Sequence, residues 1–129
     1  MMSHLTVLTD VVAVCRLPPE EEIPSWVQNK GLTALVRTPD EFSIICNERY
    51  VPGHIKMEKG WRILKVQGPL EISQVGVLAA IATPLAQAGV SIFALSTFDT
   101  DYILIREPSL LLAIDALRNA GHTIEVEPR

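Results

Sequence analysis

The pattern of apolar and polar positions is most regular in the second half of the chain. An apolar run, Val90 to Leu95, stops at the polar segment 96–101, and a second run of β-forming residues follows at 102–105. Two such runs around hydroxyl and carboxylate side chains predict a β-hairpin with a polar turn. Apolar residues spaced three and four positions apart predict helices over 73–89 and 109–120, on either side of this hairpin.

Strands at both ends complete this half of the chain. Residues 61–66 alternate between apolar and polar, and residues 122–126 close the chain as a last strand. The order strand, helix, strand, strand, helix, strand is the split βαβ arrangement of ferredoxin-like folds. Ser73 is the predicted cap of the first helix. Pro84 is expected to kink that helix, because it cannot donate a hydrogen bond to the carbonyl of Ala80.

The first sixty residues are less regular. Four segments of β-forming residues predict strands, with a turn at Thr9-Asp10 joining the first pair and a turn around Pro39 joining the second. These segments are residues 5–8, 11–17, 32–37 and 41–46. A short helix is expected around 25–29. The predicted order of strands and helix in this half resembles a shortened copy of the order predicted for the second half.

The chain is therefore predicted to be an α+β protein of two ferredoxin-like βαββαβ modules. The N-terminal module, residues 1–60, is degenerate, and the C-terminal module, residues 61–129, is complete. Each module is expected to have an antiparallel sheet with its helices on one face. A linker between them is predicted near 58–60, where composition and periodicity change, and the pattern over 47–60 is too weak to assign.

Composition narrows the class of protein. Of the 129 residues, 48% are hydrophobic and 20% are charged, which is typical of a globular chain. The formal net charge of −4, without a cluster of Lys and Arg, argues against a nucleic-acid partner. No apolar run is long enough to span a membrane, and the N-terminus lacks the features of a secretory signal. A cytoplasmic protein without a membrane partner is expected.

Residues that could catalyse a reaction are sparse. The three histidines, at positions 4, 54 and 122, lie in no recognised catalytic motif, and no glycine-rich nucleotide loop occurs. The two cysteines, Cys15 and Cys46, lie in β-type runs and are expected to be buried, reduced thiols, because their spacing does not suit zinc. We therefore expect no enzyme activity, no metal and no cofactor.

The hairpin turn contains two carboxylates, Asp99 and Asp101. Aspartate is a common turn residue, and this role alone explains both positions. A divalent metal is disfavoured because the segment offers few oxygen ligands. A third interpretation is a carboxylate that faces a cationic ligand. In a split βαβ fold, the start of the first helix and this turn can approach the same edge, and a helix N-terminus attracts a ligand carboxylate. Together the two features describe a pocket for a free amino acid.

The sequence of this turn and the order of elements around it resemble those of the ACT domains that bind amino acids. The turn sequence is Ser-Thr-Phe-Asp-Thr-Asp-Tyr, over 96–102. The resemblance is to small bacterial proteins with tandem ACT domains and to the CASTOR arginine-sensor branch. It covers residues 61–120 well and 1–60 loosely. It implies that the two predicted modules are ACT modules and that a ligand binds at the interface between two of them.

The resemblance also implies which residues contact the ligand. Gly76 lies where the family has a glycine that lets the ligand approach the backbone. Asp101 lies where the arginine-sensing members have an aspartate that contacts the ligand, and Gln74 departs from the family's pattern beside the glycine, which leaves the amino acid undefined. The implied ligand-binding residues are Ile72, Val75, Gly76, Val77, Ser91, Ile92, Ser96, Thr97, Asp99 and Asp101.

The function that these observations predict is a non-catalytic regulatory module that senses a small amino acid. It is expected to form a homodimer, since exposed sheet edges favour pairing, and to pass its signal to a regulated protein partner. The alternative is an interaction module that retains the fold for dimerisation and binds no ligand.

Overall fold

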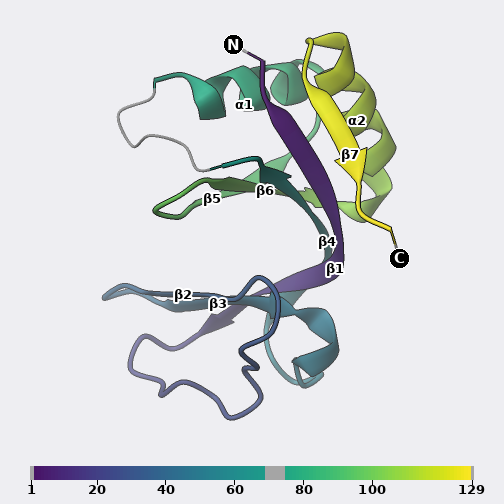
Figure 1. The fold of residues 1–129 in the computed structure, drawn as a ribbon. Helices are drawn as coiled ribbons and strands as arrows, with labels where there is room; N and C mark the ends of the chain where they lie inside the picture. Colours follow the sequence, from purple (N-terminus) through teal and green to yellow (C-terminus); the bar gives the residue numbers. More distant parts are fainter. Residues whose placement is uncertain (1, 69–74, 129) are drawn as a thin grey trace. The chain divides into compact units, whose positions relative to one another are not determined.

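The computed structural model describes residues 2–68 and 75–128 (Figure 1). Its strands are β1 (His4–Leu17), β2 (Ala34–Arg37), β3 (Phe42–Asn47), β4 (Met57–Val66), β5 (Ile92–Ser96), β6 (Asp101–Arg106) and β7 (Thr123–Val126). Its helices are α1 (Val77–Gln87) and α2 (Leu110–Asn119), with short 3-10 turns η1 (Glu48–Tyr50) and η2 (Glu107–Ser109). By contacts the chain forms two compact units: unit 1 contains the residues up to Thr9 and from Arg62 onward, and unit 2 is Asp10–Trp61.

Unit 1 contains the predicted ferredoxin-like order, which is confirmed: β4, α1, β5, β6, α2 and β7 follow one another along the chain. Its strands are ordered β7-β1-β4-β6-β5. The first residues of β1 thus lie between the two strands that begin and end this series. They pair with β7 in parallel, from His4 opposite Thr123 to Val7 opposite Val126, whereas β5 and β6 pair antiparallel.

The first strand differs from the prediction. The expected turn at Thr9-Asp10 is wrong, because β1 continues through these residues without interruption. The backbone N–H and the hydroxyl of Thr9 both donate to the side-chain oxygen Oε1 of Glu127, at 3.2 and 3.1 Å, so Glu127, the residue after β7, binds the polar groups that a turn would have used. The expected linker at 58–60 is also wrong, since these residues lie inside β4.

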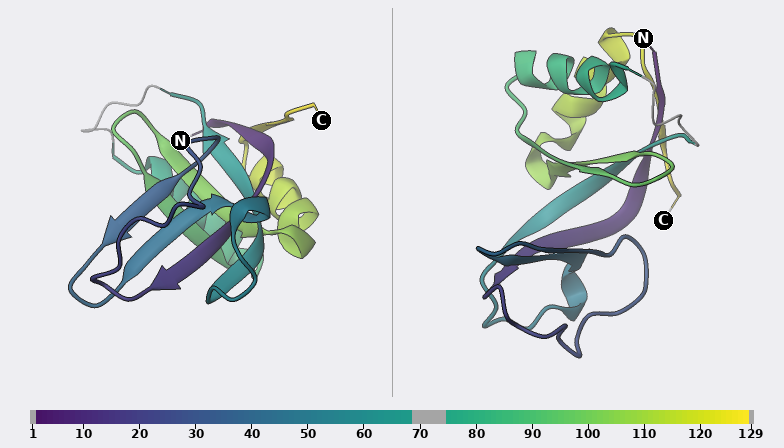
Figure 2. Two further views of the ribbon diagram at one scale, coloured as in Figure 1. Left: turned by 90° about the horizontal axis from the view of Figure 1, so that it is seen from below. Right: turned by 90° about the vertical axis from the view of Figure 1, so that its left-hand side faces the viewer.

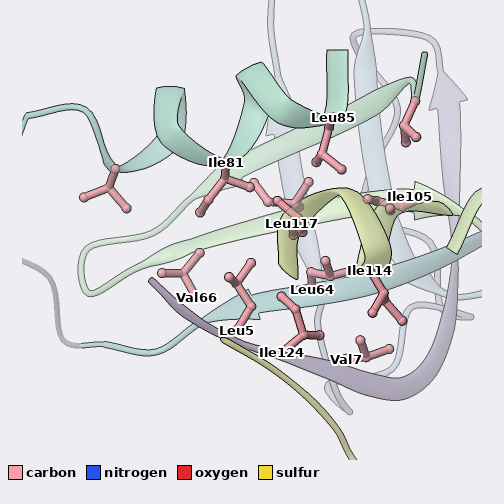
Figure 3. Close-up of a cluster of buried hydrophobic side chains, with 14 residues drawn as sticks. Leu5, Val7, Leu64, Val66, Ile81, Leu85, Ile105, Ile114, Leu117 and Ile124 are labelled. Atoms are coloured by element: carbon pink, nitrogen blue, oxygen red, sulfur yellow. The ribbon is translucent and has the colours of Figure 1, made fainter. Parts of the chain in front are cut away.

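One hydrophobic core holds both helices of unit 1 against one face of its sheet (Figure 3). Helix α1 contributes Val77, Ile81 and Leu85, which repeat at helical spacing, and α2 contributes a similar stripe ending at Leu117. The strands contribute alternate residues, including Leu64 and Val66 of β4 and Ile103 and Ile105 of β6. Because neighbouring residues of a strand point to opposite faces, Lys65 and Tyr102 point to the face without helices.

Helix α1 begins later in the chain than predicted. The helix begins at Val77, and the expected cap Ser73 lies outside the described residues. Gly76 precedes the helix with a left-handed backbone (φ +86°), a conformation that glycine adopts readily. Further along, Pro84 cannot donate to the carbonyl of Ala80, and the ring of His122 takes this place, with Nε2 lying 2.8 Å from that oxygen.

Unit 2 has a sheet ordered β2-β3-β1-β4 and a core of its own around Phe42 and Ile44. The predicted β2–β3 hairpin is confirmed, and Thr38 closes its turn through a backbone N–H bond of 2.9 Å to the carbonyl of Glu41. The expected helix at 25–29 is wrong: the segment forms a turn, in which the N–H of Val27 donates to Pro24, and its apolar side chains pack on the core.

No helix in the described part of the chain has the length and apolar character needed to cross a membrane.

Candidate functional site

The turn between β5 and β6, residues 97–100, is held by bonds between its two threonines. The N–H of Thr97 donates to the carbonyl of Thr100 at 2.8 Å, and the N–H of Thr100 donates to the hydroxyl of Thr97 at 3.2 Å. The buried hydroxyl of Thr100 donates to the carbonyl of Val66 at 2.6 Å, which ties the turn to the end of β4. These bonds fix the backbone that carries both candidate carboxylates.

The carboxylate of Asp101 is oriented by a neighbouring hydroxyl. Ser96 and Asp101 are the last pair of the hairpin, and Ser96 Oγ donates to Asp101 Oδ1 at 2.6 Å. Asp101 has the same parity along β6 as Ile103, which belongs to the core under the helices, so its side chain lies on the helix-bearing face of the sheet. A carboxylate accepts several hydrogen bonds, so this arrangement leaves acceptor capacity for a cationic group.

Helix α1 begins at the same end of unit 1 as this turn, as Figure 1 and the right-hand view of Figure 2 both show. Among the described residues, no side chain caps the helix, so within this part of the chain its first-turn N–H groups have no side-chain acceptor. Val75 is 85% exposed, whereas Val77 is 5% exposed and belongs to the core. Of the predicted contacts on this segment, Val75 and Gly76 are exposed and therefore accessible to a ligand, whereas Val77 is buried in the core.

Two predicted residues lie away from the turn. Ser91 and Ile92 are at the opposite end of β5, where Ile92 pairs with Ile105 and packs against the core. The structure does not bring them together with Ser96 and Asp101. Ile72 lies outside the described residues.

The turn also borders a hollow of about 420 Å³ on unit 1. Thr97 and Asp99 were predicted as site residues, and four further lining residues were not. Among the described residues, the lining consists of Lys65, Gly68, Thr97, Asp99, Thr100 and Tyr102. Sequence reasoning missed Lys65 because its position beside β6 follows from the pairing of β4 with β6, which no local pattern reveals.

The histidine and cysteine side chains described next take part in contacts within the protein. His122 accepts the N–H of Ser3 at Nδ1 (3.0 Å), and His4 lies 3.4 Å from Glu125. The predicted burial of Cys15 and Cys46 is confirmed. The pKa of Cys15 is raised by its hydrogen bond with Cys46 and by burial, which keeps its thiol protonated. Over residues 2–68 and 75–128, no group of three His, Cys, Asp or Glu side chains is placed to hold a metal ion.

The part of the chain that forms this site matches a known protein family. Residues 56–119 match the family model of the ACT domain. This chain is an ACT-domain protein. A second family model, which describes an N-terminal domain, matches residues 10–54. The predicted resemblance to ACT domains is therefore confirmed, and the ACT match includes α1, both strands of the β5–β6 hairpin and α2.

Similar proteins include an arginine sensor, and a part of an aspartate kinase has a similar fold. The chain is 37% identical, over 123 residues, to the human cytosolic arginine sensor for mTORC1 subunit 1; the match covers 88% of this chain and 37% of the sensor's length. A crystal structure of an Agobacterium tumefaciens protein is 34% identical, with a TM-score of 0.94, over 100% of this chain and 96% of the other. Clostridium acetobutylicum aspartate kinase shares the fold at 12% identity, with a TM-score of 0.66, over 87% of this chain and 33% of its own.

Proposed function

We propose that this protein is a non-catalytic regulatory module that binds a small amino acid at an interface between two ACT modules. The observation that carries the proposal is the carboxylate of Asp101, oriented by Ser96 at 2.6 Å, at the end of an ACT unit where α1 begins. The arginine sensor relative is named for an amino-acid ligand, which supports the class of ligand.

The N-terminus of α1 and the carboxylate of Asp101 have opposite charges. The N-terminus of α1, which no described side chain caps, offers backbone N–H groups and partial positive charge, which favours the carboxylate of an amino acid. Asp101 supplies a negative charge for an ammonium or guanidinium group. Gly76 adds no side chain between the helix start and a ligand, and its left-handed backbone suits glycine. A zwitterion matches this pair of features better than a simple anion or a simple cation does.

The second ACT module of such an interface can come from the same chain or from a second copy. We propose that residues 1–60 are a degenerate ACT-like module and that residues 61–129 are the complete one. The chain spans 37% of the length of its human relative, so two copies would supply more of the surface that a longer chain contains. We further propose that the protein acts in the cytoplasm, as the name of that relative states for the relative, and signals to a protein partner.

A thermal-shift screen with the twenty standard amino acids tests this function. A ligand that binds the folded state alone raises its stability by about 2.7 kcal/mol at a hundred times its Kd, so one amino acid is expected to raise the Tm by several degrees. The Asp101→Asn variant in the same screen is the matched control and should respond less. If no amino acid raises the Tm of the wild-type protein, the result supports the alternative, an interaction module without a ligand.

Sedimentation analysis tests the proposed assembly. Unit 1 has β5 and β7 at the ends of its strand order, and exposed strand edges are commonly covered by pairing. We expect a symmetric dimer at micromolar concentration, with twice the mass of the 14.2 kDa chain. A species of 14.2 kDa that persists across the micromolar range would contradict this prediction.

A further inference from the structure

The hollow on unit 1 lies on the other face of the β5–β6 turn from Asp101. Lys65 neighbours Leu64 and Val66, whose side chains are in the core under the helices, and Tyr102 neighbours Ile103 in the same way. Strand alternation therefore places Lys65 and Tyr102 on the sheet face without helices. The hollow that they line is consequently separated from the site of the proposed function by the thickness of the sheet.

The lining combines opposite charges with neutral donors. Lys65 contributes an ammonium group, Asp99 a carboxylate, Tyr102 a phenol, and Thr97 a hydroxyl. Neither Lys65 nor Asp99 forms an ion pair with another side chain in the described part of the chain. The volume of about 420 Å³ is within the range of small-molecule pockets. Each charge is thus available to a group of opposite sign on one small molecule.

The wall that carries Asp99 is fixed before any ligand arrives. Thr97 and Thr100, on either side of the turn, are bonded to each other, and Thr100 is bonded to Val66 of β4 at 2.6 Å. The turn and the strand that carries Lys65 therefore move together. A fixed spacing between the backbone positions that carry two opposite charges lowers part of the ordering cost of binding a ligand that has both.

We propose that this hollow is a second ligand site, which binds a small zwitterion such as an amino acid through Lys65 and Asp99. Lys65 and the hydroxyl of Tyr102 bind the ligand's anionic group, and Asp99 binds its cationic group. The proposal goes beyond the proposed function, because it adds a site on the opposite face of the sheet, with anchors that the first site does not use.

Amide NMR titrations with the twenty standard amino acids, performed on the full chain, test this site. At least one amino acid is expected to shift the resonances of Lys65, Gly68 and Tyr102 saturably. Lys65→Gln and Asp99→Asn should each weaken that response about tenfold, the scale of one charged hydrogen bond, whereas Asp101→Asn should leave it unchanged. Saturable shifts at Gly76 and Val77 report the first site separately, so either site can fail while the other is retained.

Ligand derivatives provide the matched control for the responding amino acid. Its methyl ester lacks the carboxylate, and its N-acetyl form lacks the ammonium group. The wild type should lose affinity for both derivatives, Lys65→Gln should no longer distinguish the ester from the parent, and Asp99→Asn should no longer distinguish the acetyl form. The proposal is overturned if no amino acid shifts the hollow's resonances, or if both variants respond as the wild type does.

Discussion

Replacing His122 by Phe is expected to lower the free energy of unfolding by about 2 kcal/mol, because it leaves two polar backbone groups without their partner. The ring of His122 is 4% exposed, accepts the N–H of Ser3 at 3.0 Å and lies 2.8 Å from the carbonyl of Ala80. With Nδ1 as an acceptor, Nε2 carries the proton that is donated to Ala80. Phe has a similar shape and makes neither bond. Chemical denaturation monitored by circular dichroism measures the loss.

Two further variants separate hydrogen bonding from packing. His122→Gln places an amide donor near the position of Nε2 and should lose less stability than His122→Phe. Pro84→Ala restores an N–H that can donate to the carbonyl of Ala80, so it should stabilise the His122→Phe protein by about 1 kcal/mol more than it stabilises the wild type. Equal gains in the two backgrounds would mean that His122 does not replace the hydrogen bond that Pro84 removes.

The parts of the fold that local sequence determines were predicted well. The β5–β6 hairpin and α2 are close to their expected ranges, because alternation, helical spacing and turn residues all act within a few positions. Ser96 and Asp101 were each predicted as site residues, and the hydrogen bond between them was found only in the structure. Local sequence patterns were therefore sufficient to predict the β5–β6 hairpin and α2.

The errors lie where distant segments decide the structure. Thr9 and Asp10 are good turn residues, yet pairing of β1 with β7 and the bonds from Thr9 to Glu127 keep the strand continuous. The insertion of β1 beside β4 could not be read from residues that lie some fifty positions apart. For the same reason, Lys65 was not associated with Asp99, although both line one hollow. Pro84 was correctly expected to free a carbonyl, but its partner, His122, came from the far end of the chain.

Asp101→Asn is expected to weaken binding of the amino acid found in the thermal screen by roughly tenfold to a hundredfold. The substitution keeps the shape of the side chain and removes the charge that a ligand's ammonium or guanidinium group would contact. Folding should change little, because an amide oxygen can still accept the 2.6 Å bond from Ser96 Oγ. Isothermal titration calorimetry with the same ligand measures the change.

Asp99→Asn is the matched control, since it removes the same charge two residues away. Asp99 is exposed and lines the hollow on the opposite face of the turn, so its substitution should change the affinity of the first site much less than Asp101→Asn does. A ligand whose cationic group is removed by acetylation should bind wild type and Asp101→Asn equally, because the carboxylate then has no charge to pair with. If the unmodified ligand also binds both proteins equally, Asp101 shapes the hairpin through Ser96 and takes no part in binding.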